Sequence, residues 1–336
     1  MSRTRQVLFP IAVDPDALRD HPTDRDQLVH REVVTTLGDR GILSLPEVDR
    51  EALYRAIEGL GDLSRTLWVK QLHGLYDLNR LDQIPHARGV GDRLRQPGHV
   101  NDEVAAVRLI VAAREAAEAH GVDDRSGYKT IDETDIVMAG TIHRSPALAD
   151  RDTLGVFPLG TTRRAIIASG FLKPLAERST AVKILDPHLL EDLISGYASP
   201  AHAEWLLRTL AGTMPPHSTL SILGRLQRQW QEADRAVQEA RIEEFLNHVL
   251  SERVEPMTVR VRLLKATTLK NRFMWFSCGH SYDVLHNFAA LSSDPLNEEL
   301  RFTRQNDEIA QQTLQTAERI EDNTQQTMVS VTKTFP

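Results

Sequence analysis

Apolar strands alternate with longer helical segments between residues 181 and 264, and this order most constrains the fold. The apolar segments span 181–185, 219–224 and 258–264, and the helical segments span 201–212 and 225–250. In the last strand Val259, Val261 and Leu263 alternate with arginines, as in a strand with one buried face. A strand–helix–strand–helix–strand order is typical of a sheet covered by helices. The sequence therefore predicts an α/β fold with flanking helices.

The first of these strands ends near Asp186, because Pro187 has no N–H with which to continue a strand ladder. Asp186 and His188 therefore lie at the carboxyl end of a strand, where α/β sheets commonly bind ligands. We predict a candidate cleft with these two residues at its edge. The alternative is a turn-forming Asp before Pro, which needs no ligand.

A second aromatic strand, Phe273–Phe276, follows the strand at 258–264 after a polar link. The segment GlyHisSerTyrAsp at 279–283 is then typical of a turn. Two strands joined by a short link predict a hairpin or neighbouring strands. We expect the functional site of the chain in this stretch, 259–288.

Residues 1–160 are predicted to form a separate module, either α/β or mostly helical. Apolar segments favour strands at 7–13, 42–45 and 136–139. The segment 101–120 is predicted to be a helix that Asn101 caps and Gly121 ends. His143, just after a predicted strand, could be catalytic or structural.

Residues 161–300 form the second predicted domain, and 301–336 are predicted to form a polar helical tail. The tail has only a thin apolar stripe at helical spacing, formed by Ile309, Leu314 and Ile320. Such a stripe is compatible with packing on another helix or chain, and equally with a tail that frays.

Charge and cysteine content restrict the possible partners. A net charge of −7 argues against nucleic-acid binding by the whole surface, although a local basic groove remains compatible with it. Cys278 is the one cysteine among 336 residues, which excludes a disulfide framework and favours a reducing, cytoplasmic setting. No apolar run approaches the roughly 20 residues of a membrane span, so we expect none. No pattern indicates a cofactor or a metal site.

Residues 165–290 resemble phospholipase D-like domains, of the bacterial single-domain type and of the carboxy-terminal domain of MIT-domain proteins. Three segments carry the resemblance: LeuAspProHisLeu at 185–189, LysAsnArgPhe at 270–273 and GlyHisSerTyrAspVal at 279–284. In active members of that family a histidine begins the second segment, a basic residue follows it, and a downstream acid orients the histidine. The resemblance implies a mixed sheet with flanking helices.

The family's catalytic positions are substituted in this chain. Lys270 occupies the place of the histidine, Arg272 that of the basic residue, and Ser277 that of the acid. A protonated lysine cannot readily replace imidazole as a nucleophile, so the comparison predicts loss of hydrolysis. Lys270, Arg272 and Ser281 remain suited to holding a phosphate. Solvated charges at a strand entrance explain the two cations equally well.

A displaced histidine is the catalytic alternative. His280 and His286, together with Asp283, could reach one cleft, and histidine transfers protons at neutral pH. Since the family often completes its site across a homodimer, an active phosphodiesterase or nuclease of this kind would self-associate.

The leading hypothesis is a non-catalytic phospholipase D-like binding or assembly subunit in the cytoplasm. The resemblance implies a bacterial complex that handles nucleic acid, in defence against phage or plasmid DNA, with a protein partner or a second copy of the chain. A membrane-surface module that binds anionic lipid is the third hypothesis. The acidic net charge and the lack of a basic amphipathic helix weigh against it.

Overall fold

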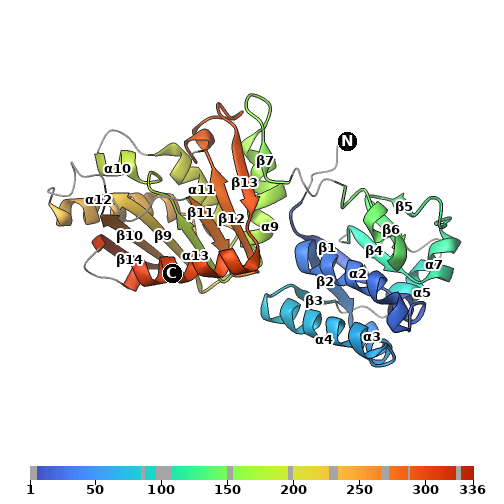
Figure 1. Ribbon diagram of the computed structural model, residues 1–336. Coiled ribbons are helices and arrows are strands. Elements are labelled where there is room, and N and C mark those ends of the chain that lie inside the picture. The colour runs from blue at the N-terminus through green and yellow to red at the C-terminus, as the bar shows by residue number, and fades with distance from the viewer. Residues whose placement is uncertain are drawn as a thin grey trace. The chain divides into compact units, whose positions relative to one another are not determined.

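The computed structural model divides the chain into two compact units, residues 1–153 and 154–336, each with its own sheet (Figure 1). We call them unit 1 and unit 2. The described residues are 6–84, 88–95, 107–149, 154–195, 200–226, 234–265, 272–286, 288–322 and 327–336.

Unit 1 is a six-stranded sheet in the order β3-β2-β1-β4-β6-β5. Every neighbouring pair is parallel except β5 with β6. The strands are β1 (Phe9–Val13), β2 (Gly41–Pro46), β3 (Leu81–Ile84), β4 (Leu109–Ala112), β5 (Tyr128–Ile131) and β6 (Thr134–Met138). The helices are α1 (Pro15–Arg19), α2 (Gln27–Arg40), α3 (Glu47–Glu58), α4 (Asp62–Asp77), α5 (Val90–Leu94) and α7 (Arg114–Ala119), and a 3₁₀ turn, η2 (Ala139–Arg144), follows β6.

Helices cover both faces of this sheet. Alternate strand residues such as Ile11 and Val111 pack with α2 and α4 on one face, whereas Ala12 and Ile110 pack with α5 and α7 on the other. After β3 the chain crosses to the far side of β1, so the strand order reverses between β1 and β4. Unit 1 is therefore a doubly wound α/β layer structure.

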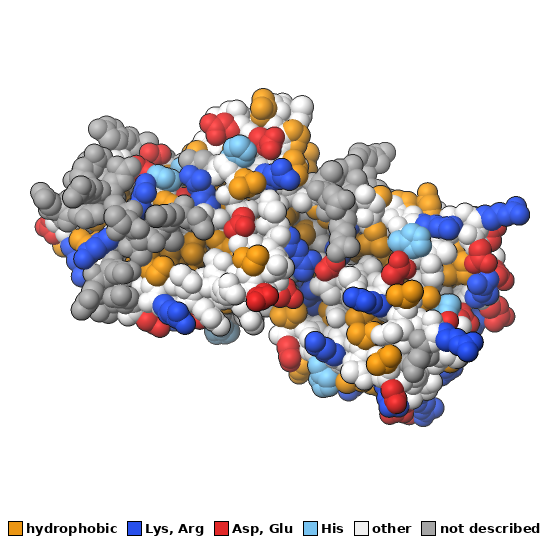
Figure 2. All heavy atoms as spheres, viewed as in Figure 1, with side chains coloured by type: hydrophobic (Ala, Val, Ile, Leu, Met, Phe, Trp, Pro, Cys, Tyr) orange, Lys and Arg blue, Asp and Glu red, His pale blue; other side chains and the backbone are white. Residues whose placement is uncertain are grey.

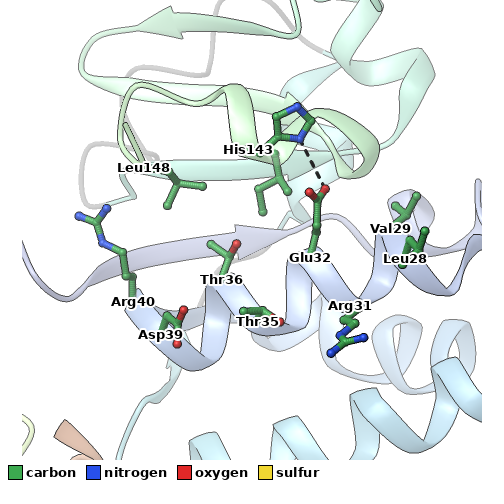
Figure 3. A pocket seen from close by; sticks show the side chains of 11 residues that line it. Leu28, Val29, Arg31, Glu32, Thr35, Thr36, Asp39, Arg40, His143 and Leu148 are labelled. Carbon is green, nitrogen blue, oxygen red and sulfur yellow. Dashed lines mark ion pairs between the residues drawn. The ribbon is translucent and has the colours of Figure 1, made fainter. Parts of the chain in front are cut away.

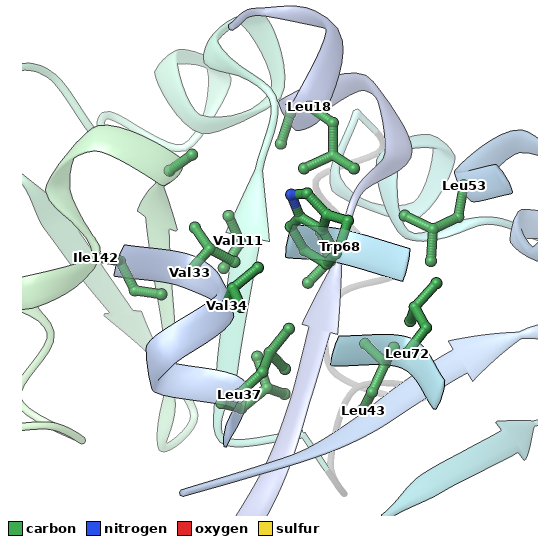
Figure 4. Packing of buried hydrophobic residues seen from close by; sticks show 14 of the residues in the cluster. Leu18, Val33, Val34, Leu37, Leu43, Leu53, Trp68, Leu72, Val111 and Ile142 are labelled. Carbon is green, nitrogen blue, oxygen red and sulfur yellow. The ribbon is translucent and has the colours of Figure 1, made fainter. Parts of the chain in front are cut away.

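Trp68 on α4 lies at the centre of the larger core, fully buried between α2 and the sheet (Figure 4). Its indole Nε1 donates a hydrogen bond of 3.1 Å to Nδ1 of buried His30. His30 Nε2 donates to the carbonyl of His21 over 2.6 Å. Both contacts require neutral His30 with its proton on Nε2. Burial lowers the pKa of His30 below its ordinary value, which favours the same neutral form.

Unit 2 is an eight-stranded sheet in the order β14-β10-β9-β8-β11-β12-β13-β7. Strands β8, β9 and β10 are mutually parallel, and their neighbours on both sides are antiparallel. The strands are β7 (Val156–Phe157), β8 (Ala181–Leu185), β9 (Ser218–Leu226), β10 (Met257–Lys265), β11 (Phe273–Phe276), β12 (His280–Leu285), β13 (Leu300–Arg304) and β14 (Thr327–Phe335). The helices are α8 (Arg164–Ile167), α9 (Lys173–Ala176), α10 (Glu191–Ser195), α11 (Ala201–Ala211), α12 (Arg235–Leu250) and α13 (Asp307–Asp322).

Helices lie on both faces of this sheet too (Figure 1). On one face Ala317 and Ile320 of α13 pack against Leu185, Phe273 and Trp275. Lys183 of β8 forms an ion pair of 3.3 Å with Glu318 on the same face. Helices α11 and α12 cover the opposite face. The predicted α/β fold with flanking helices is therefore confirmed.

Several expectations for individual segments are corrected. The strands predicted at 258–264 and 273–276 are not neighbours, because β9 and β8 lie between β10 and β11. Residues 280–283, predicted as part of a turn, belong to β12. The amino-terminal module is α/β rather than mostly helical. Residues 109–112, predicted as part of a helix, form β4, because these four apolar residues fill the place between β1 and β6 and are completely covered there. The tail at 301–336 contains the predicted helix, but its first residues belong to β13, and its last residues form β14, which pairs along the length of β10. It completes the sheet of unit 2.

The neutral state of His30 gives a testable pH dependence. Because the folded chain binds a proton on His30 less readily than the unfolded chain, its contribution to stability is lost as the pH falls below 6.5. We expect His30→Asn to reduce the difference in unfolding free energy between pH 7.5 and pH 5.5, measured by urea denaturation. Asn can still accept from Trp68 but does not titrate. An unchanged pH dependence would contradict this role for His30.

Candidate functional site

Three neighbouring strands of unit 2 bring polar side chains to one edge of the sheet. Asp186 follows β8, Arg225 lies near the end of β9, and Arg272 immediately precedes β11. The ladder between β8 and β9 extends one residue past β8, since the Asp186 N–H donates to the carbonyl of Leu223 over 3.0 Å. Pro187 then ends the pairing. This edge, with His188 and Glu191, is called the strand-end site below.

Asp186 is the centre of the site and is completely buried. Its Oδ1 accepts the backbone N–H of His188 at 2.7 Å and lies 3.5 Å from Nε of Arg272. Its Oδ2 has no hydrogen-bond partner among the described residues. Burial raises the pKa of Asp186, while the His188 N–H and the charge of Arg272 oppose that shift. Asp186 therefore requires a cation beside it to stay ionised.

His188 lies between a carboxylate and a guanidinium. Its Nδ1 contacts Oε2 of Glu191, three residues later, and its Nε2 lies 3.4 Å from Nη2 of Arg225. An ionised carboxylate can only accept and a guanidinium can only donate. The proton of neutral His188 is therefore on Nδ1, and Nε2 presents a lone pair. The imidazole is about one-third exposed, with a side-chain accessibility of 32%.

Two guanidiniums flank the end of β8, one from each neighbouring strand. Adjacent strands are about 4.8 Å apart, so the backbones that carry Arg225 and Arg272 are separated by roughly 10 Å. The Nε atoms of both arginines are buried without a hydrogen-bond partner in the described part of the chain. These buried Nε atoms are not accessible to a ligand, which can meet only the terminal nitrogens of the two guanidiniums; cations of this kind suit a phosphate or another oxyanion.

His202 on α11 adds a second imidazole near Asp186. Burial lowers its pKa, and the charges of Asp192 and Asp186 act in the opposite direction. Its Nδ1 lies 3.4 Å from the hydroxyl of Ser292. His202 is buried, so it braces α11 beside the site rather than facing solvent.

The structure brings together some of the residues that the sequence indicated. Asp186, His188 and Arg272 lie together at the strand-end site. That this edge forms a cleft stays a prediction. Lys270 lies outside the described residues, and so does the link that carries it. The phosphate-binding role of Arg272 stays a prediction.

Ser281 is not grouped with Arg272. The backbone carbonyl of Arg272 accepts from the N–H of Val284, three residues beyond Ser281, which corresponds to about 10 Å along a strand. Ser281 is paired with Trp275, whose side chain packs towards α13. Asp283 has the same strand parity as Ser281, and it accepts a 2.6 Å hydrogen bond from Gln305 Nε2. Strand alternation therefore separates both residues from Asp186, which is on the α11 side.

The structure also separates the residues of the displaced-histidine alternative. His280 is completely buried at the opposite end of β11, paired with Phe276, and its Nδ1 lies 3.0 Å from the hydroxyl of Tyr282. His286 is exposed just after β12, with a φ of 68°. His280 and Asp283 are three apart on one strand and so point to opposite faces. These residues do not form one cluster.

Arg225 and Glu191 were not predicted from the sequence. Extending the predicted strand at 219–224 by one residue would have placed Arg225 at the same edge as Asp186. Glu191 follows His188 at a spacing that brings the two side chains together in a helical turn, which is a signal available in the sequence. His202 has no such signal.

Unit 1 has a separate pocket of about 640 Å³ between α2 and the segment after β6 (Figure 3). Leu28, Ile142 and Leu148 supply apolar lining. His143 lies at its rim, where Nδ1 is 3.5 Å from Oε2 of Glu32 on α2. The exposed ion pair is consistent with the structural role considered for His143.

Two acidic residues lie at the carboxyl ends of β1 and β2, near the strand-order reversal of unit 1. Asp14 accepts backbone N–H groups from Asp16 and Ala113, and Asp49 accepts the N–H of Val90. A Cβ on Gly91 would lie 2.9 Å from the Asp14 carboxylate, so glycine lets α5 approach this end of the sheet. Burial raises the pKa of Asp14 to about 6.

The chain matches no protein-family model, and no curated protein has a similar sequence. Among the described residues, His, Cys, Asp and Glu side chains form no group of three or more suited to a metal ion. None of the helices described here is long and apolar enough to cross a membrane.

The elevated pKa of Asp14 predicts a stability change at acid pH. The folded chain retains its proton up to about pH 6 and the unfolded chain only up to 3.8, so stability falls as the pH rises between these values. The corresponding loss is at most about 3 kcal/mol at neutral pH. We expect Asp14→Asn to reduce the change in unfolding free energy between pH 4 and pH 6, measured by urea denaturation. The exposed Asp62→Asn is the control, and an equal slope in both variants would contradict the prediction.

Proposed function

We propose that unit 2 binds phosphate groups of a nucleic acid at the strand-end site. The observation that carries this proposal is the pair of arginines beside the end of β8, with Arg272 held by Asp186 and Arg225 in contact with His188. The N–H groups of a planar guanidinium match phosphate oxygens in geometry as well as in charge. A phosphodiester backbone offers such oxygens at every nucleotide.

The buried carboxylate of Asp186 fixes one of these cations in place. The ion pair of 3.5 Å holds Arg272 at the strand entrance, and His188 contacts Arg225 on the other side. A ligand therefore meets donors that need little ordering on binding, which favours affinity. Asp186 and Glu191 balance the two guanidiniums in formal charge, so recognition of a phosphate rests on the placement of the arginine donors.

The rest of the surface does not provide a general attraction for nucleic acid. The net charge is −7, and Figure 2 shows acidic and basic side chains interspersed over the described part of the face in view. Binding through the strand-end site thus involves few phosphates and a weak dependence on salt. This fits a subunit that engages nucleic acid as part of a larger complex.

The phospholipase D-like resemblance is consistent with this proposal. The strand that the family's basic segment enters is β11, and Arg272 stands directly before it, beside the acidic–proline turn after β8. We therefore propose that unit 2 is a phospholipase D-like domain that retains the phosphate-binding part of its site. The bacterial defence setting rests on the resemblance alone.

Replacing both arginines tests the function. We expect Arg225→Ala/Arg272→Ala to weaken binding of a labelled single-stranded DNA oligonucleotide by about 10-fold or more, since each charge-assisted contact contributes about 1.5–3 kcal/mol. Fluorescence anisotropy at fixed salt gives the affinity, and circular dichroism checks the fold.

The matched control is Arg260→Ala/Arg319→Ala, which removes two exposed arginines from β10 and α13 of the same unit. This control variant lowers the net charge by the same amount as Arg225→Ala/Arg272→Ala but leaves the strand-end site intact. Equal affinities of both double variants and the parent would overturn the proposed site. Binding of anionic vesicles without binding of the oligonucleotide would replace nucleic acid by a lipid surface.

A further inference from the structure

The strand-end site contains a group that can change its charge near neutral pH, the imidazole of His188. Its two ring nitrogens contact opposite charges. Nδ1 donates to Oε2 of Glu191, and Nε2 lies 3.4 Å from Nη2 of Arg225. While His188 is neutral, Nε2 can only accept, so it engages one terminal nitrogen of Arg225. A ligand of Arg225 must therefore compete with an acceptor that belongs to the protein.

The turn that carries His188 is held by contacts of both its backbone and its ring. The backbone N–H donates to buried Asp186 over 2.7 Å, and the carbonyl accepts the N–H of Glu191 at 3.1 Å. The ring is held through Nδ1 by the carboxylate of Glu191. A proton added to Nε2 would therefore face the guanidinium of Arg225 directly.

Protonation of His188 changes what the site offers to a phosphate. It turns Nε2 from an acceptor into a donor, so Arg225 loses its acceptor and two cations face each other. A phosphate oxygen between the two groups can accept from both, and charge-assisted hydrogen bonds of this kind are strong. Because Asp186 and Glu191 balance the two guanidiniums, the added proton also makes the formal charge of the site positive.

We propose that the strand-end site binds the phosphate groups of nucleic acid together with a proton on His188, so that affinity increases as the pH falls from 7.5 to 5.5. The inference rests on the proposed function, because Arg225 and Arg272 must hold the phosphate. Phosphate binding and protonation favour each other to the same extent, since coupling between two ligands is reciprocal. Glu191 is a positioning residue that acts through His188.

Other groups of the site also bear on its charge. Among the described residues they are the acids Asp186, Glu191 and Asp192 and the bases Arg225, Arg272 and His202. Burial raises the pKa of Asp186 and lowers that of His202. His202 contacts Ser292 rather than an arginine of the site. A proton on Asp186 would remove the charge that holds Arg272, so the two possible sources of a proton are separated by substitution.

The test measures the affinity of the full chain for a labelled oligothymidylate at pH 7.5, 6.5 and 5.5 and constant ionic strength, by fluorescence anisotropy. Neither thymine nor a phosphodiester titrates in this range, so a change in affinity reports on the protein. We expect the parent to bind about 10-fold more tightly at pH 5.5 than at pH 7.5, as is usual for two coupled ligands. Calorimetry in two buffers of different ionisation enthalpy should show proton uptake on binding, and circular dichroism at each pH checks the fold.

His188→Asn should leave the affinity at pH 7.5 close to that of the parent and remove its increase at lower pH. Asn still donates to Glu191 but takes up no proton. Glu191→Gln should move the increase to lower pH, because a neutral amide no longer stabilises the imidazolium. A residue that only braced the turn would leave the increase where it is. The matched control is His248→Asn, which removes another exposed imidazole of unit 2 that lies 3.5 Å from a glutamate, Glu204, and should keep the pH dependence of the parent.

The possible outcomes separate this inference from the proposed function. An equal pH dependence in the parent and in His188→Asn overturns the role of His188, and so does a dependence that Asp186→Asn alone removes. Binding that depends on Arg225 and Arg272 but not on pH overturns the proton coupling and leaves the proposed function standing. Absence of binding at all three pH values, or binding that Arg225→Ala/Arg272→Ala does not weaken, overturns both.

Discussion

Parallel pairing of neighbouring strands is the constraint on which both units depend. Parallel strands need long crossover connections, and the crossover helices must cover the sheet because its central strands carry buried side chains on both faces. The same pairing aligns the carboxyl ends of neighbouring strands at one edge. In unit 1 this edge carries Asp14 and Asp49, and in unit 2 it carries Asp186 and Arg225. Polar groups gather there because the ladder hydrogen bonds end.

Electrostatics then shape the edge of unit 2. A completely buried carboxylate is costly unless a cation or hydrogen bonds stabilise its charge. Asp186 obtains one backbone donor from His188 and the nearby charge of Arg272 from an antiparallel strand. The antiparallel strand β11 begins beside the point where β8 ends, so the cation enters the sheet where the carboxylate needs it. Structural stability therefore depends on this ion pair, and so does the phosphate recognition that we propose.

Unit 1 shows how burial selects protonation states without a ligand. Burial lowers the pKa of His30 and raises that of Asp14, so both groups favour their neutral forms. The neutral imidazole completes the hydrogen bond from Trp68 at the core, whereas Asp14 accepts N–H groups at the end of β1. Their contributions to stability change with pH in opposite directions, because one group is a base and the other an acid.

The local pattern of the sequence predicted the strands around 181–185, 219–224 and 258–264, the crossover helices and the turn at Asp186. These predictions succeeded because apolar periodicity and proline determine the backbone conformation of the few residues around them. It failed at 109–112, where helix signals around an alanine-rich segment were overridden by burial of four apolar residues between two strands. Which side chains meet was decided by tertiary structure alone. Arg272 reaches Asp186, and Ser281 does not, because strand register and the two-residue alternation of faces are set by pairing between segments some ninety residues apart in the chain.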